Sequence, residues 1–221
     1  MKFKLSIFLF TFCLNIFAQL PKGFVYLRDV APDVIIELRY CSNNNFVGST
    51  ISGYNLEVCI VTVQTADALK IIQEELKKQQ LSLKIYDAYR PQRAVNHFWT
   101  WAKNVNDTLM KQQFYPDVVK RNLFKEEYIA TKSRHSSGST VDLTIVDLRN
   151  NREIDMGTSY DFFGEESWVF YKNLKKQQKD NRMLLHNIMK KHGFRHYPKE
   201  WWHFTLDKEP FKNQYFDFVI E

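Results

Sequence analysis

Glycine, proline and cysteine are all scarce in this chain. Its 221 residues include 7 glycines, 6 prolines and 3 cysteines. No internal repeat, low-complexity stretch or Pro/Gly-rich linker divides it, which excludes a string of linked modules. The hydrophobic and charged fractions, 44% and 25%, are those of an ordinary globular protein and argue against a disordered or membrane-embedded chain. We therefore expect one medium-sized domain.

The main apolar run lies at the N-terminus, within residues 1–18. A basic start precedes the run at residues 5–17, and Ala18 provides a small residue for cleavage. This pattern predicts a secretory signal peptide, and the run is too short to span a bilayer well. A membrane anchor that is never removed is the alternative. We expect residues 19–221 to form the mature domain, secreted or periplasmic and without stable membrane insertion.

The net positive charge of the full chain is small, at +6. The lysine pairs at residues 175–176 and 190–191 are interrupted by acids and apolar helix positions. This arrangement is typical of solvated helix faces. It indicates no nucleic-acid partner.

The predicted mature chain contains only two cysteines. Cys13 lies in the predicted signal peptide, so Cys41 and Cys59 remain in the mature chain. In an exported protein we expect these two to form a disulfide. Two independent buried thiols are the alternative, and neither cysteine has the spacing partner of a zinc knuckle.

Hydrophobic periodicity predicts an α+β domain with a mainly antiparallel sheet flanked by helices. The predicted helices cover residues 64–79, a segment opened by Pro91 with Val105 on its buried side, and residues 181–192, which Gly193 ends. The predicted strands cover residues 81–86, 140–145 and 194–204. In the strand at 140–145, Asp142 is expected on the face opposite the apolar side chains.

Two short segments carry metal-ligand residue types. They read S-R-H-S-S-G-S-T-V-D at residues 133–142 and E-W-W-H at residues 200–203. His135, Asp142 and His203 can fill three corners of a zinc tetrahedron, and a catalytic zinc site keeps its fourth position open. The remaining carboxylate, Glu200, is suited to act as general base and then general acid. The other histidines lack an acidic partner at ligand spacing and are assigned no metal role: His97, His186, His192 and His196.

The spacing of Glu200 and His203 predicts a local irregularity. Residues three apart point to opposite faces of a regular strand, so we expect a turn or bulge at Trp201-Trp202. The two indole rings are expected to pack in the core and dry the wall of the site. Such a wall raises the pKa of Glu200 toward the working pH.

These segments and several others resemble the zinc D-alanyl-D-alanine dipeptidases of the vancomycin-resistance type. Beyond the two metal-ligand segments, the matches are R-Y-x-x-x-x-N-F-x-G at residues 39–48, D-A-Y-R-P-Q-R-A-V-N at 87–96, D-M-G-T-S-Y-D at 155–161 and Y-F-D-F-V at 215–219. They follow the family's order over about the whole mature chain. The resemblance implies a Hedgehog/D,D-peptidase-like zinc peptidase fold, one Zn²⁺ per chain, and a small D,D-dipeptide as substrate.

The resemblance also implies roles for individual residues. Arg90 would hold the oxyanion of the reaction, although a structural salt bridge to Asp87 is the alternative. Tyr40 and Asp161 would bind the free ammonium of the dipeptide, and Ser133 would help to hold its carboxylate. From the residues alone, Asp161 is also explained as a helix cap or loop acid.

The sequence departs from the resembled pattern at Tyr160, where phenylalanine is frequent, and at Thr140, where the family has a smaller alanine. Two rival functions remain open. One is a D,D- or L,D-carboxypeptidase or endopeptidase acting on peptidoglycan with the same zinc site, and the other is a non-catalytic cell-wall-binding module. Glu200 and Arg90 favour an enzyme, because structural zinc needs neither. The oligomeric state is not defined by the sequence.

Overall fold

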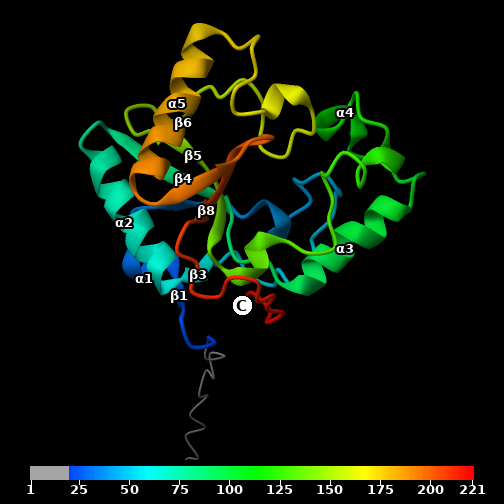
Figure 1. Ribbon diagram of the computed structural model, residues 1–221, viewed down its shortest axis with the longest axis horizontal. Helices are drawn as coiled ribbons and strands as arrows, with labels where there is room; N and C mark the ends of the chain where they lie inside the picture. Colours follow the sequence, from blue (N-terminus) through cyan, green and yellow to red (C-terminus); the bar gives the residue numbers. More distant parts are fainter. Residues whose placement is uncertain (1–19) are drawn as a thin grey trace, which may run out of the picture.

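A six-stranded sheet forms the centre of the computed structural model, which describes residues 20–221 (Figure 1). Its strands follow the order β2 (Ile35–Ile36), β4 (Leu81–Asp87), β5 (Thr140–Asp147), β8 (Glu200–Leu206) and β7 (Phe194–Tyr197), with β6 (Arg152–Glu153) paired to β5. Within this sheet, among the residues that the structure describes, β2 and β4 are the only strands that pair in parallel, which confirms the mainly antiparallel α+β fold. A separate antiparallel pair joins β1 (Phe24–Tyr26) to β3 (Ile60–Thr62). The predicted signal peptide, residues 1–18, lies outside the described residues.

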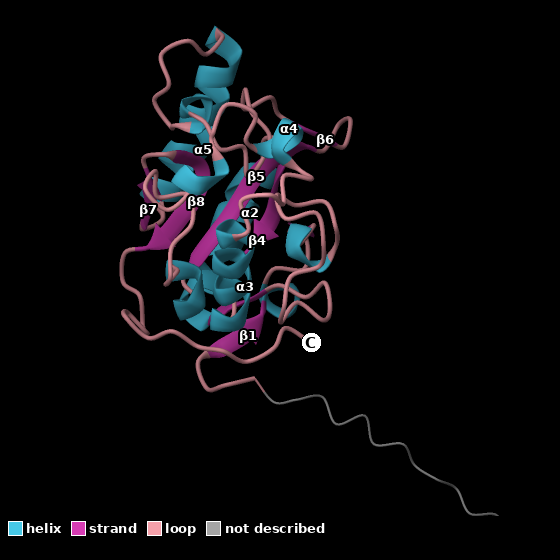
Figure 2. Ribbon diagram, turned by 90° about the vertical axis from the view of Figure 1, so that its right-hand side faces the viewer, coloured by secondary structure: helices cyan, strands magenta, loops and turns pink. Residues whose placement is uncertain are grey.

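Helices lie on both sides of these strands. In Figure 1, α2 and α3 lie on opposite sides of the molecule with the central strands between them, and Figure 2 gives the view turned by 90°. The α-helices are α1 (Leu27–Val30), α2 (Val63–Lys77), α3 (Gln92–Lys103), α4 (Lys111–Phe114) and α5 (Lys176–Lys191). Short 3-10 helices are η1 (Arg39–Cys41), η2 (Lys120–Asn122), η3 (Arg134–Ser137) and η4 (Glu165–Ser167). Among the described helices, none is long and apolar enough to cross a membrane.

The helix predictions hold within a few residues except at the start of α5, which begins at Lys176 and not at residue 181, and one side chain was misplaced. Helix α2 buries the predicted stripe of Leu69, Ile72 and Leu76. Pro91 caps α3 and directly precedes its first residue. The prediction for Val105 is wrong, because the helix ends at Lys103 and Val105 is 50% exposed.

Two strand predictions need correction. The segment predicted as one strand over residues 194–204 is a hairpin, in which Tyr197 of β7 pairs with Glu200 of β8. The two residues between them include Pro198, which favours a tight turn. In β5 both faces are buried, so Asp142 lies in the interior at 2% exposure and is not on an open polar face.

The expected disulfide does not form in the structure, where Cys41 and Cys59 are both free. Cys41 lies in η1 and its Sγ donates a hydrogen bond to the carbonyl of Leu56 at 3.2 Å. Cys59 is buried just before β3. Burial raises the pKa of Cys41 to about 12 and raises the pKa of Cys59 as well. Cys59 thus matches the buried thiol of the alternative that the sequence left open, whereas Cys41 is half-buried.

Candidate active site

Asp142 and His203 are brought together by the sheet itself. They occupy neighbouring antiparallel strands and are direct partners in the β5–β8 register. His135 arrives from outside the sheet, in η3, which ends at Gly138 with a φ of +76°. A Cβ at Gly138 would lie 2.2 Å from the ring of Phe24. The glycine thus allows the tight reversal that folds His135 back onto β5.

The three side chains form a compact donor set that could hold a metal ion. Nε2 of His135 lies 3.3 Å from Nδ1 of His203 and 3.3 Å from Oδ2 of Asp142. Nδ1 of His203 lies 3.0 Å from Oδ1 of Asp142. In a tetrahedral zinc site with bonds of about 2.0–2.1 Å, ligand atoms are roughly 3.3 Å apart. The spacing of the donor atoms therefore fits zinc.

Hydrogen bonds prepare these groups for metal binding. Nδ1 of His135 lies 2.8 Å from the carbonyl oxygen of Ala88. A proton on Nδ1 completes that bond and leaves Nε2 with a free lone pair, the form that a metal needs. Burial by itself raises the pKa of Asp142, but His135 and His203 together hold it well below its usual range. Asp142 is therefore ionised, as a metal ligand must be.

Glu200 reaches the donor set through the predicted irregularity of β8. Tyr197 pairs with Glu200 and His196 pairs with Phe204, so the three intervening residues of β8 have no counterpart on β7. This bulge confirms the prediction and turns Glu200 and His203 toward one another, with Oε2 of Glu200 3.3 Å from Nδ1 of His203.

The tryptophans beside Glu200 form a dry wall, as expected. Trp201 and Trp202 are 3% and 1% exposed, and Nε1 of Trp201 donates to Oγ1 of Thr158 at 2.8 Å. Burial is the largest influence on Glu200 and raises its pKa to about 7, despite the opposing effect of His203. A carboxyl group with this pKa can both accept and return a proton near neutral pH.

Arg90 makes the structural salt bridge and also lines the cleft. Its Nε and Nη2 lie 2.9 Å and 2.8 Å from Oδ2 of Asp87, which is completely buried. Its Nη2 lies 3.6 Å from Oδ2 of Asp142. The guanidinium packs over the rings of Tyr40 and Phe98, at 5.1 Å and 5.2 Å from their centroids. These contacts fix the direction of a positive charge beside the metal donors.

Tyr40 and Asp161 meet in the same cleft, although 121 positions separate them in the sequence. The hydroxyl of Tyr40 donates to Oδ2 of Asp161 at 2.8 Å. Asp161 has a φ of +60°, in the left-handed region that a non-glycine residue seldom adopts. Burial, with Asp142 second, raises the pKa of Asp161 well above its usual value. A buried carboxyl group of this kind is a natural partner for a cation.

One cleft of about 600 Å³ is lined by every residue predicted for the metal, the proton transfer and the substrate. Ser133 lies at its edge, half-buried, and its Oγ accepts the backbone N–H of His135 at 3.3 Å. Residues 127–134 form one wall of the cleft. An ion pair of 2.5 Å between Glu127 and Lys199 ties this wall to the β7–β8 turn. The four histidines without an assigned metal role do not line the cleft.

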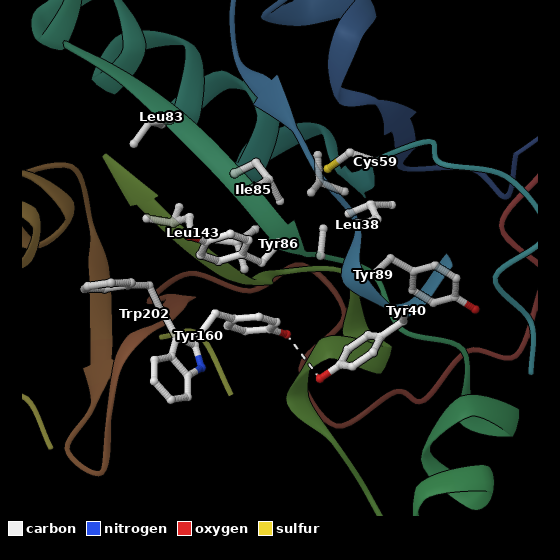
Figure 3. Packing of buried hydrophobic residues seen from close by; sticks show 14 of the residues in the cluster. Leu38, Tyr40, Cys59, Leu83, Ile85, Tyr86, Tyr89, Leu143, Tyr160 and Trp202 are labelled. Carbon is white, nitrogen blue, oxygen red and sulfur yellow. Dashed lines mark hydrogen bonds between the residues drawn. The ribbon is translucent and has the colours of Figure 1, made fainter. Parts of the chain in front are cut away.

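Sequence reasoning missed two features of the site. One is the hydroxyl of Tyr54, which donates at 2.6 Å to Oδ1 of Asp87, the carboxylate whose salt bridge to Arg90 was the expected alternative. The other is Tyr160, which the sequence marks only as a departure from the family pattern. Its hydroxyl lies 3.1 Å from the hydroxyl of Tyr40 (Figure 3). It also lies 3.1 Å from Oδ2 of Asp142. Tyr54 lies in none of the sequence motifs that match the family, so nothing in the sequence gave a reason to place it in the site.

The fold and the site together define a metallopeptidase, with a His/Asp/His donor set, an adjacent carboxylate and a positioned arginine in one cleft. Comparison with known proteins agrees. A family model described as D-ala-D-ala dipeptidase, of the M15 peptidases, matches residues 21–221, and the chain belongs to this family.

Its relatives are similar over most of their length. The chain is 35% identical to a D-alanyl-D-alanine dipeptidase of Enterococcus faecium over 90% of its own length and 98% of the relative. It is 33% identical to one of Streptomyces coelicolor over 89% and 98% of the two chains. With one of Escherichia coli, the identity is 33% over 82% and 83%.

Proposed function

We propose that this protein is a zinc-dependent dipeptidase that hydrolyses D-alanyl-D-alanine to two D-alanines. The observation that carries the proposal is the convergence of three metal donors, Glu200 and the Tyr40–Asp161 pair in one cleft. Full-length similarity to proteins named for this activity supports the choice of substrate.

His135, Asp142 and His203 would hold the Zn²⁺. The fit rests on their donor spacing and on Oδ1 of Asp142, a buried oxygen with no hydrogen-bond partner among the described residues. Bound Zn²⁺ would polarise the peptide carbonyl and lower the pKa of a water molecule at the open position of the site.

Glu200 would move the proton. With a pKa raised to about 7 by burial, it takes a proton from the attacking water and returns it to the departing amine. Arg90 would face the oxygen of the attacked carbonyl as negative charge develops there. A single fixed donor of this kind contributes about 3–4 kcal/mol to lowering the barrier.

The two ends of the substrate would be held by charge. The carboxylate of Asp161 and the ring of Tyr40 accept the free ammonium, and Ser133 with the nearby edge of η3 takes the carboxylate. Because Asp161 is buried, an acyl group on the amine would remove the positive charge that pairs with its carboxylate. The proposal therefore concerns free dipeptides and not peptidoglycan chains.

The proposed site of action is outside the cytoplasm. The basic start and apolar run of residues 1–18 support export, to the periplasm or the medium. Fractionation of cells that express the full chain, with immunodetection of the mature protein, tests this directly.

The activity test uses purified protein stripped of metal. D-alanine release from D-alanyl-D-alanine should be absent in the stripped protein and restored by one equivalent of Zn²⁺. Full activity without metal, or none after zinc is restored, would reject the proposal.

A further inference from the structure

Tyr160 is a buried tyrosine whose hydroxyl contacts Tyr40 and Asp142, two residues that line the cleft. Its side chain is 4% exposed, and its ring stacks on Tyr86 with centroids 4.6 Å apart and an interplanar angle of 17°. The edge of Trp202 closes the other side at 5.5 Å (Figure 3). These neighbours fix the ring, so the position of its hydroxyl is set by packing.

The hydroxyl of Tyr160 hydrogen-bonds to one oxygen of Asp142 and not to the other. Oδ2 accepts a hydrogen bond from the hydroxyl of Tyr160 at 3.1 Å, and it lies 3.3 Å from Nε2 of His135 and 3.6 Å from Nη2 of Arg90. Oδ1 has no hydrogen-bond partner among residues 20–221, and it lies 3.0 Å from Nδ1 of His203. The hydroxyl has one proton to donate, and a hydrogen bond to the ionised carboxylate of Asp142 is stronger than one to the neutral hydroxyl of Tyr40. Oδ1 is thereby left to face the metal.

We propose that Tyr160 is a positioning residue that holds Oδ2 of Asp142 and so presents Oδ1 to the zinc ion. The inference rests on the zinc site of the proposed function and deepens it. Without the hydroxyl, the donor left beside Oδ2 among the described residues would be Arg90 at 3.6 Å, because Nε2 of His135, 3.3 Å away, carries no proton in the metal-binding form. The carboxylate could then rotate, and the donor set would lose its fixed geometry.

The test compares Tyr160→Phe with a matched control, Tyr115→Phe. Tyr115 is also buried, but its hydroxyl has no hydrogen-bond partner among the described residues. Both changes remove one buried hydroxyl and keep the ring. Zinc affinity is measured by competition with a chromogenic chelator, without any substrate, and metal-free thermal unfolding reports on the fold.

Tyr160→Phe should weaken zinc binding about tenfold, the lower end of the range for groups that orient a ligand. Tyr115→Phe should leave the affinity unchanged. With saturating zinc, Tyr160→Phe should recover most of its kcat. An unchanged zinc affinity in Tyr160→Phe would overturn the inference, as would an equal loss in both variants. Because the affinity is measured without substrate, a wild-type protein that binds zinc but cleaves no D-alanyl-D-alanine would reject the proposed function alone.

Discussion

Asp142 lies directly opposite His203 in the β5–β8 ladder, with Oδ1 of the one 3.0 Å from Nδ1 of the other. The sheet register alone places two of the three proposed metal donors side by side. Only His135 depends on a turn outside the sheet, which Gly138 permits.

His203→Ala should lose most of the bound zinc, because it removes one of only three donors at the site. Elemental analysis should give about one zinc per wild-type chain and far less for the variant. His186→Ala is the matched control, since His186 lies on α5 away from the cleft, and it should keep its metal. Full zinc occupancy in His203→Ala would remove that residue from the ligand set.

Glu200→Gln should keep the metal and the fold but lose turnover. The amide preserves the shape of the side chain while it removes the group that accepts and returns the proton, so kcat should fall by roughly 10²–10⁴. Zinc content and the melting temperature serve as controls. If kcat fell only a few-fold with zinc retained, a different group would have to be the base.

Asp161→Asn should lose activity and gain thermal stability, and the gain in Tm should depend on pH. Burial raises the pKa of Asp161 in the folded protein, so ionisation of Asp161 costs the folded state more than the unfolded one. That cost is absent below the unfolded pKa of about 3.9 and grows as the pH rises toward the folded pKa. The gain in Tm of Asp161→Asn over wild type should therefore be near zero in acid and largest at neutral to alkaline pH. A gain that does not vary with pH would show that Asp161 is not a strained carboxyl group.

Local periodicity predicted most of the elements that carry the site. Metal-ligand chemistry predicted four residues of the site: His135, Asp142, His203 and Glu200. The family resemblance predicted the other residues of the site: Arg90, Tyr40, Asp161 and Ser133. The stripe of Leu69, Ile72 and Leu76 identified α2 because a helix repeats every 3.6 residues. The bulge before His203 followed from the alternation of a strand, since Glu200 and His203 have to face one metal.

Features that depend on three-dimensional packing could not be read in this way. The bond from Tyr160 to Asp142 requires a loop to fold across β5, and nothing in the local sequence encodes that contact. The expected disulfide failed because spacing along the chain says nothing about the direction of two Sγ atoms. Val105 was misplaced because the periodic pattern runs past the residue at which α3 ends.

Substrate length tests the central claim most directly. D-alanine release is compared for free D-alanyl-D-alanine, its N-acetylated form and a muramyl pentapeptide, at matched concentrations with zinc present. We expect the free dipeptide to be cleaved much faster than the other two substrates, because Asp161 and Tyr40 bind a free ammonium. Asp161→Ala should reduce this difference in rate, because it damages cleavage of the free dipeptide most. Efficient trimming of the pentapeptide with the dipeptide left intact would contradict the account and establish a carboxypeptidase with the same metal centre.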